Sequence, residues 1–290
     1  MTHDPSRLKA IANYYRETRI EYRIAWAHRP IFAMHFGYWD ETTPNHVAAL
    51  INGNRQVAER AELEPGQFVL DAGCGVGGTA MWLAENYGVQ AAGITLVHDQ
   101  AVRGRRWAEG RGLQGRVFLS LQDYLQTGFP DGTFDAVYAM ESACHTPDKR
   151  AFFAEAYRVL KPGGRIVVED GFRPDRPYTD DERRLQDSWL SDFLVAPIPT
   201  ADEWTATARD AGFEDIRMED CTAHYMRSSR RLYRIALLVY PWASGLHALK
   251  LRSDVQHGNL RAARGQWVGL KRGLWLFGIL TARKPLANVT

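Results

Sequence analysis

Short apolar runs alternate with amphipathic segments through the middle of this chain. An apolar run over 68–70 leads into a glycine-rich turn, and an amphipathic segment follows. Repeated alternation of buried strand and helix is typical of a parallel sheet with right-handed crossovers. The pattern predicts strands over 67–70, 90–94, 116–119, 134–138 and 165–169, and helices over 77–87, 98–110 and 148–160.

The alternation stops after Asp170. Prolines at 174, 177, 197 and 199 bracket a predicted helix over 179–194, which we interpret as an inserted helical cap. A capping-box pattern over 200–203 begins the next helix, because a Thr followed three residues later by Glu satisfies free backbone N–H groups. The remaining expected elements are a strand over 214–218, helices over 228–245 and 258–270, and a last strand over 274–282.

These elements predict an α/β fold with a seven-stranded, mostly parallel sheet and helices on both faces. The 290 residues suffice for one such domain with additions. We expect an N-terminal helical lid over 1–62 and a core over 63–170. We expect a cap insertion over 171–200. The rest of the core, with helical additions, is expected over 201–290.

Charge and cysteine content narrow the class of protein. Net charge is only +2, yet residues 220–290 carry twelve Lys or Arg and two acids. A solvated basic face, an anionic ligand, a membrane surface and the acidic remainder of the chain all stay open as partners. No recognition motif for nucleic acid accompanies the charge. The three cysteines are scattered, and the sequence shows no signal peptide. The apolar runs are too short to span a bilayer. These features predict a cytoplasmic protein without transmembrane segments.

The turn after the first strand is the most informative motif. It reads FVLDAGCGVGG over 68–78, with an acid at the strand tip and closely spaced glycines. Glycines let the backbone turn sharply and let a ligand lie against it. The turn lacks the lysine of a P-loop, and it resembles motif I of the class I S-adenosylmethionine (SAM) dependent methyltransferases. That resemblance implies a Rossmann-like fold and SAM as cofactor, held by Asp71, Gly73 and Gly75.

The second and third strands add further cofactor residues by resemblance. Most class I enzymes place an acid after the second strand to bind the SAM ribose, where this chain has Thr95. The segment Thr95, Leu96 and Gln100 resembles tocopherol methyltransferases and cyclopropane synthases, in which these residues contact SAM. Asp123 follows the third strand, where class I enzymes bind the adenine amino group; a turn or N-cap role is the structural alternative.

A segment after the fourth strand makes the resemblance more specific. It reads YAMESACHTPD over 138–148 and is similar to segments of sterol C-methyltransferases and tocopherol methyltransferases. Those families share a Glu and a His at the separation of Glu141 and His145. The N-terminal aromatic residues, the HFGYW segment over 35–39, Glu169 and the tail over 280–285 extend the similarity, whereas the cap is unmatched.

Methyl transfer to an alkene creates a carbocation, and aromatic faces attract cations. Four aromatic residues recur at helical spacing, so we expect them on one helix face; core packing is the alternative. A base must then remove a proton, a role open to a carboxylate or a neutral His. The candidate substrate-binding aromatics are Tyr14, Tyr15, Tyr22 and Trp26, and the candidate catalytic residues are Glu169, His145, Glu141 and Tyr22. Glu141 is also a candidate for SAM binding.

A second stripe on the same predicted helix bears on the substrate. Arg16, Arg19 and Arg23 could clamp a diphosphate, with Mg2+ needed only in that case, or form a solvated face beside Glu17 and Glu21.

The sequence therefore predicts a SAM-dependent C-methyltransferase acting on an isoprenoid alkene, a prenyl diphosphate or a prenylated natural product. Alternatives are an O- or N-methyltransferase of a polar small molecule and a sterol C-methyltransferase. We also expect a homo-oligomer, no nucleic acid partner, and at most a peripheral membrane contact.

Overall fold

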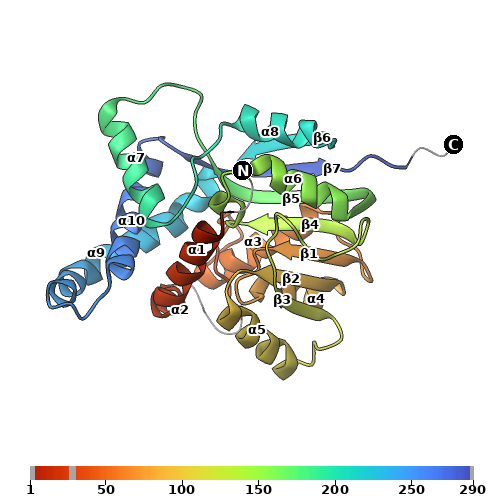
Figure 1. Cartoon of the computed structure of the whole chain (residues 1–290), viewed down its shortest axis with the longest axis horizontal. Helices are drawn as coiled ribbons and strands as arrows, with labels where there is room; N and C mark the ends of the chain where they lie inside the picture. The colour runs from red at the N-terminus through yellow and green to blue at the C-terminus, as the bar shows by residue number, and fades with distance from the viewer. Residues whose placement is uncertain (1–3, 26–30, 288–290) are drawn as a thin grey trace.

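The computed structural model describes residues 4–25 and 31–287, which form one seven-stranded sheet with helices around it (Figure 1). The strands lie in the order β3-β2-β1-β4-β5-β7-β6, and β7 runs antiparallel to both of its neighbours. The expected seven-stranded, mostly parallel sheet is confirmed. The strands are β1 (Phe68–Ala72), β2 (Gln90–Thr95), β3 (Val117–Leu121), β4 (Phe134–Met140), β5 (Leu160–Phe172), β6 (Glu214–Asp220) and β7 (Leu276–Arg283).

Successive residues of the central strands enter two separate apolar cores. Val69 packs in a core with residues of three helices, α3 (His46–Arg60), α4 (Gly78–Tyr87) and α5 (His98–Gly110). Leu70 points to the other core, which contains residues of α6 (Lys149–Val159) and α8 (Ala201–Asp210). Because side chains alternate across a strand, near-continuous apolar runs such as 68–70 bury both faces of the sheet.

The remaining helices gather beyond the carboxyl ends of the parallel strands (Figure 1). α10 (Asp254–Lys271) packs against α7 (Asp180–Asp192) and α9 (Thr222–Ala248). Two N-terminal helices, α1 (Pro5–Glu17) and α2 (Arg19–Ala25), lie on the near side of this group, and α1 contacts α10. Capping boxes begin α7, α8 and α10, and that of α8 is the one expected from the sequence.

Three expectations about boundaries are wrong. The N-terminal helix is not continuous: it stops at Thr18, whose Oγ1 donates to the Tyr14 carbonyl oxygen and competes with the helical hydrogen bonds. α9 and α10 are longer than the predicted 228–245 and 258–270. β5 begins before the predicted start and continues past Glu169 to Phe172, because β7 pairs with it over 165–172.

No helix within residues 4–25 and 31–287 is long and apolar enough to cross a membrane. A cytoplasmic location and a homo-oligomeric state stay predictions.

Candidate active site

The glycine-rich turn after β1 forms one wall of a cavity at the carboxyl ends of β1, β2 and β4. Gly73 and Gly75 both have positive φ, 101° and 53°, which glycine adopts without strain. A Cβ on Gly73 would lie 2.3 Å from the Ser142 Cβ, so a larger residue cannot occupy this position without displacing the next segment. Of the predicted cofactor residues, the turn and its neighbours bring together Asp71, Gly73, Gly75, Thr95, Leu96, Gln100 and Glu141.

Thr95 and Gln100 form a buried pair in the same cavity. The Thr95 hydroxyl donates to Gln100 Oε1 at 2.7 Å, and the backbone N–H of Val97 donates to Thr95 Oγ1. This arrangement leaves the Gln100 amide nitrogen turned toward the Met34 sulfur, 3.9 Å away. Asp123 does not line the cavity; its Oδ1 accepts a hydrogen bond from the Leu125 N–H, as a turn residue does. Its role with adenine stays a prediction.

The charge of this cavity suits a cationic ligand. Burial raises the pKa of Asp71 to about 7 and that of Glu141 well above the usual carboxyl range. SAM carries a sulfonium and an amino group, and a nearby positive charge favours the ionised form of a carboxyl. The glycine cradle and the two buried acids therefore fit SAM, with Asp71, Gly73, Gly75, Thr95 and Gln100 as the residues that would hold it.

A second cavity adjoins the first and has a volume of about 380 Å³. Its walls are mostly apolar and come from α7, α9, α10 and β7, far apart in the sequence. The large side chains among them include Trp189, Phe193, Leu232, Leu260, Trp275 and Phe277. This is the place in the molecule where an apolar acceptor fits.

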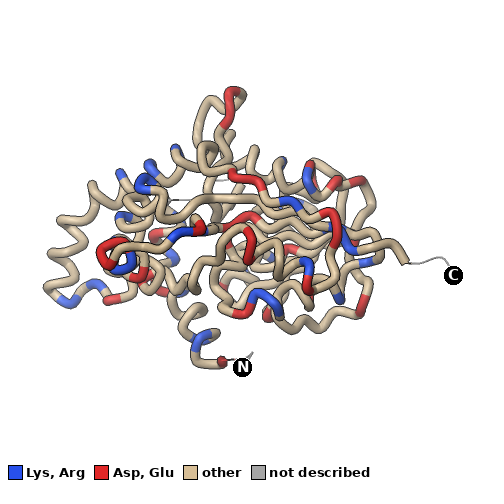
Figure 2. Tube along the Cα trace, turned by 90° about the horizontal axis from the view of Figure 1, so that it is seen from above, with Lys and Arg blue, Asp and Glu red and all other residues tan. Residues whose placement is uncertain are grey.

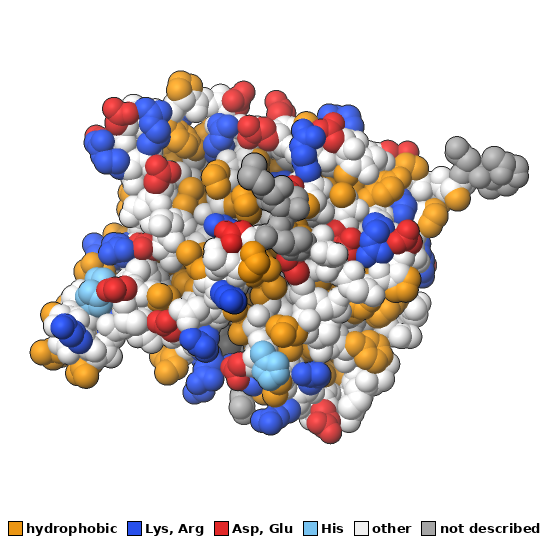
Figure 3. All heavy atoms as spheres, viewed as in Figure 1, with side chains coloured by type: hydrophobic (Ala, Val, Ile, Leu, Met, Phe, Trp, Pro, Cys, Tyr) orange, Lys and Arg blue, Asp and Glu red, His pale blue; other side chains and the backbone are white. Residues whose placement is uncertain are grey.

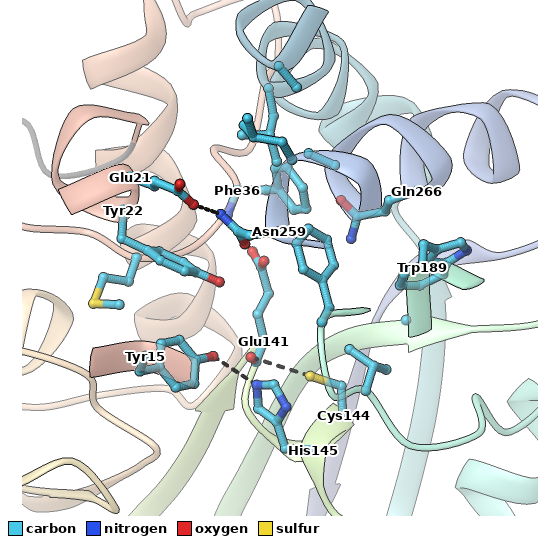
Figure 4. Close-up of a pocket in the computed structure, with 18 of the residues that line it drawn as sticks. Tyr15, Glu21, Tyr22, Phe36, Glu141, Cys144, His145, Trp189, Asn259 and Gln266 are labelled. Atoms are coloured by element: carbon cyan, nitrogen blue, oxygen red, sulfur yellow. Dashed lines mark hydrogen bonds between the residues drawn. The ribbon is translucent and has the colours of Figure 1, made fainter. Parts of the chain in front are cut away.

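Glu141 lies on the wall that the two cavities share (Figure 4). It follows β4 directly and has φ 50°, a left-handed conformation that costs a non-glycine residue about 1–3 kcal/mol. Its Oε1 accepts a hydrogen bond from the backbone N–H of Phe36. In Figure 4 its side chain lies between Tyr15 and Tyr22 on one side and Trp189 on the other. The strained backbone thus directs a carboxylate to the junction of cofactor and acceptor.

Glu169 does not line either cavity. The sequence predicts it at a strand end, but β5 continues for three more residues, paired with β7, and the Glu169 side chain lies beside those of Glu141, His35 and Tyr225. It is fully buried, and neither carboxylate oxygen accepts a hydrogen bond within residues 4–25 and 31–287. Burial raises its pKa to about 8. Oxygen atoms of Glu169 and Glu141 and a nitrogen of His35 all lie within 4.8 Å of one another.

The proximity of the two carboxylates affects their ionisation. Burial raises the pKa of Glu141 first, and the negative charge of Glu169 raises it further. Two buried carboxylates this close do not both ionise readily. Both His35 nitrogens already contact oxygen atoms, of Phe36 and Asn54, so a metal ion bound by this trio would have to displace these contacts. Glu169 is therefore placed to set the pKa of Glu141.

His145 lines both cavities and is held in one tautomer. Its Nδ1 lies 3.1 Å from the Leu194 carbonyl, which can only accept, so Nδ1 carries the proton. Nε2 then accepts from the Tyr15 hydroxyl at 2.8 Å. Burial lowers the pKa of His145 to about 4 and raises that of Tyr15 well above 10. His145 is thus a neutral, weak base whose lone pair is already in use, which favours Glu141 for proton removal.

The N-terminal tyrosines meet although their helix is interrupted. Ring centroids of Tyr15 and Tyr22 are 5.4 Å apart, and both line the acceptor cavity. Tyr14 is buried outside it, where its hydroxyl donates to Asn259 of α10 at 2.5 Å. Tyr14 therefore anchors α1, whereas Tyr15 and Tyr22 face the cavity. Trp26 lies outside the described residues.

The three arginines line a small cavity between α1, α2 and α5 that adjoins the two larger ones and shares Tyr15 and Met34 with both. Arg16, Arg19 and Arg23 are exposed, and the half-buried Arg103 lines the same cavity. Arg19 pairs with Asp99 at 3.3 Å, with both side chains about half exposed, so the pair contributes little stability. None of the three lines the large apolar cavity.

Several residues of the site are absent from the sequence-based prediction. Phe36 provides the N–H that holds Glu141, and Trp189 and Phe277 form apolar walls. Phe36 belongs to the segment over 35–39 that carries part of the family resemblance, but nothing in the sequence indicates its contact. The apolar walls come from helices and a strand whose packing no local pattern reveals.

Comparisons with known proteins identify the family. The family described as "Mycolic acid cyclopropane synthetase" matches residues 31–234. A rice (Oryza sativa subsp. japonica) protein, "Probable tocopherol O-methyltransferase, chloroplastic", is 32% identical over 97% of this chain and 79% of its own length. The chain belongs to this family of SAM-dependent methyltransferases. A sterol 24-C-methyltransferase of Gibberella zeae is 30% identical to this chain; the match covers 72% of this chain and 54% of the sterol enzyme.

Solved structures share the fold of the methyltransferase. The [4+2]-cyclase SpnF is 26% identical, covers 97% of each chain and has a TM-score of 0.77. The cyclopropane synthase MmaA2 of Mycobacterium tuberculosis is 18% identical over 98% of this chain and 99% of its own, with a TM-score of 0.83. The geranyl diphosphate C-methyltransferase of Streptomyces coelicolor, solved with Mg2+ and geranyl diphosphate, is also 18% identical. The match covers 98% of this chain and 99% of that chain, with a TM-score of 0.73.

SAM affinity tests the first cavity. Gln100→Leu removes the amide that the Thr95 hydroxyl orients, and we expect SAM to bind roughly 5- to 150-fold more weakly, since a lost buried hydrogen bond costs about 1–3 kcal/mol. Isothermal titration calorimetry measures this directly. Gln56→Leu on α3, outside the cavity, serves as the control. Unchanged SAM affinity in folded Gln100→Leu would contradict the assignment of this cavity.

Proposed function

We propose that this methyltransferase transfers the SAM methyl group to an alkene carbon of an isoprenoid, with Glu141 as the base. The observation that carries the proposal is the position of Glu141 on the wall shared by the polar cofactor cavity and the large apolar cavity. Tyr15, Tyr22 and Trp189 line the apolar cavity, and in Figure 4 the two tyrosines lie on one side of Glu141 and Trp189 on the other. A base beside aromatic faces is the arrangement that forming and quenching a carbocation requires.

Bound SAM would supply an electrophilic methyl group, and its sulfur would keep the electron pair of the broken S–CH3 bond and leave as S-adenosylhomocysteine. The alkene contributes the electron pair of the new C–C bond, and the carbon next to it becomes positive. Tyr15 and Tyr22 would stabilise this charge, because the faces of aromatic rings attract cations. The raised pKa of both hydroxyls keeps these side chains neutral. Glu141 then removes a proton from the adjacent carbon, and the C–H electron pair restores a double bond. The positive charge nearby favours an ionised Glu141.

The surroundings of the apolar cavity favour a neutral acceptor over a diphosphate. Among the described residues two cations line it, and both have partners: Arg252 pairs with Glu21, and Lys149 donates to the carbonyl oxygens of Ala143 and Thr146. The predicted arginines line a small adjoining cavity, and none of the three lines the apolar cavity itself. A prenylated natural product without a diphosphate, and hence without Mg2+, fits these contacts better. A sterol stays open as a larger neutral acceptor.

O-methylation of a prenylated phenol is the second candidate. It is favoured by the rice relative, a probable tocopherol O-methyltransferase that matches over nearly the whole chain. In that reaction Glu141 or His145 would take the hydroxyl proton. The two functions use the same cavities and differ in the atom that receives the methyl group.

A panel of acceptors tests the proposal. The enzyme is incubated with SAM and with prenyl diphosphates, neutral prenylated aromatics and sterols, and products are identified by mass spectrometry. We expect methylation of a neutral prenylated acceptor, with KM changed less than twofold in Arg16→Ala, Arg19→Ala and Arg23→Ala. If the acceptor is a diphosphate held by these arginines, each variant instead raises KM by one to two decades, since bonds to charged groups contribute about 1.5–3 kcal/mol.

A further inference from the structure

An exposed apolar stripe runs along the distal half of α9. Leu238, Trp242 and Leu249 are 77%, 81% and 70% exposed, respectively, and their spacing of four and seven residues puts them on one side of the helix. Leu251, just after the helix, is exposed as well. Monomeric soluble proteins rarely expose contiguous large apolar side chains of this kind without an interaction to make. The stripe therefore needs a partner.

The stripe reaches the mouth of the acceptor cavity. Trp242 of the stripe lines that cavity, and so does the neighbouring exposed residue Leu246. From the other side of the opening, α2 contributes Ile20 and Ile24, both exposed and both lining the cavity. The entrance of the acceptor cavity is thus framed by apolar side chains of two helices that face outward.

The segment that carries the stripe is basic, and the exposed Asp254 that follows it pairs with His247. Residues 221–253 contain six Lys or Arg and no Asp or Glu. Arg230 and Arg234 are exposed on α9 before the apolar stretch, and Lys250 is exposed after it. Figure 2 shows this projecting end as mostly uncharged chain with basic and acidic residues near its tip, and Figure 3 shows hydrophobic side chains there beside charged ones.

We propose that the distal half of α9, with α2, docks on the surface of a bilayer containing anionic phospholipids. Apolar side chains with a tryptophan, bordered by cations, are the composition of helices that lie in the lipid headgroup region. Cations near such a surface are attracted by its negative potential, which a neutral apolar partner would not explain. An acceptor dissolved in the bilayer then enters the cavity directly; this last step rests on the proposed function, whereas docking itself does not.

Flotation of the full-length chain with vesicles tests the docking. We expect co-flotation with vesicles of 70% phosphatidylcholine and 30% phosphatidylglycerol, and weaker binding to phosphatidylcholine alone or in high salt. The double variant Leu238→Ser/Leu249→Ser should lower the apparent affinity about tenfold or more, because both side chains lose their apolar burial. Arg230→Gln and Arg234→Gln should each lower it about fivefold for anionic vesicles only.

The matched control is Leu286→Ser, which removes an equally exposed leucine from the tail at the opposite end of the molecule. It should bind vesicles like the wild type, and SAM titration checks that every variant is folded. Failure of the wild type to float with anionic vesicles, or wild-type binding by the double variant, would overturn docking. A wild-type dimer in light scattering that the double variant turns into a monomer would overturn it too, in favour of a second copy. None of these outcomes bears on methyl transfer to a soluble acceptor.

Discussion

Replacing Glu141 with Gln is expected to lower kcat by a factor of about 10²–10⁴, whereas SAM should still bind. The substitution keeps the oxygen that accepts the Phe36 N–H, so the loop geometry is retained. It removes the only carboxylate that, among the described residues, lines both cavities, and a general base contributes roughly this factor. Single-turnover kinetics with the acceptor and SAM titration by calorimetry measure the two effects separately.

Glu109→Gln on the exposed face of α5 is the control for this loss and should leave kcat unchanged. His145→Gln should reduce kcat less than Glu141→Gln, because the pKa of His145 near 4 makes it a weak base. Wild-type turnover in Glu141→Gln would contradict its role as the base, and a larger loss in His145→Gln would transfer that role to His145.

Replacing Glu169 with Gln stabilises the protein, and increasingly so as the pH rises. The pKa of Glu169 is about 8 in the folded state, above the 4.5 expected when unfolded. Between these values the unfolded chain releases a proton that the folded protein retains, so the wild type loses stability as pH rises. The Gln variant lacks this loss. We expect the free energy of unfolding of the Gln variant to be close to that of the wild type at pH 4.5. At pH 8 it should exceed the wild-type value by on the order of 4 kcal/mol.

Urea unfolding of both proteins across pH 4.5–8.5 measures this difference, and Glu109→Gln controls for an exposed carboxyl. A second readout separates the effect on Glu141. Without the Glu169 charge, the pKa of Glu141 falls, so the rise of kcat with pH shifts to lower pH. A stability difference independent of pH, or an unshifted rate profile, would contradict the coupling of the two carboxylates.

Local patterns predict the part of the fold that local forces determine. The apolar runs of β1 and β2 and the acid and glycines after β1 each depend on a few neighbouring residues. The capping box of α8 is equally local. The glycine turn and the segment with Thr95 and Gln100, which line the cofactor cavity, could therefore be predicted from local sequence. Asp123 does not line this cavity, and its turn role gives the same local pattern as a cofactor contact.

The acceptor side depends on contacts between distant segments. The continuation of β5 past Glu169 follows from its pairing with β7, which comes more than a hundred residues later and inserts between β5 and β6. The hold on Glu141 comes from the N–H of Phe36, 105 residues earlier. The break at Thr18 depends on one side-chain hydrogen bond, which helical periodicity does not reveal. Glu169 is a candidate base in the sequence-based prediction. In the structure it lies outside both cavities and beside Glu141, and its catalytic role stays a prediction.

The identity of the atom that receives the methyl group tests the central claim most directly. The enzyme is incubated with SAM carrying a deuterated methyl group and with the acceptor from the panel, and the product is examined by carbon NMR. We predict a CD3 group bonded to carbon, with one alkene proton lost to solvent. A CD3 group on oxygen or nitrogen, or an acceptor converted without any label, would contradict alkene methylation.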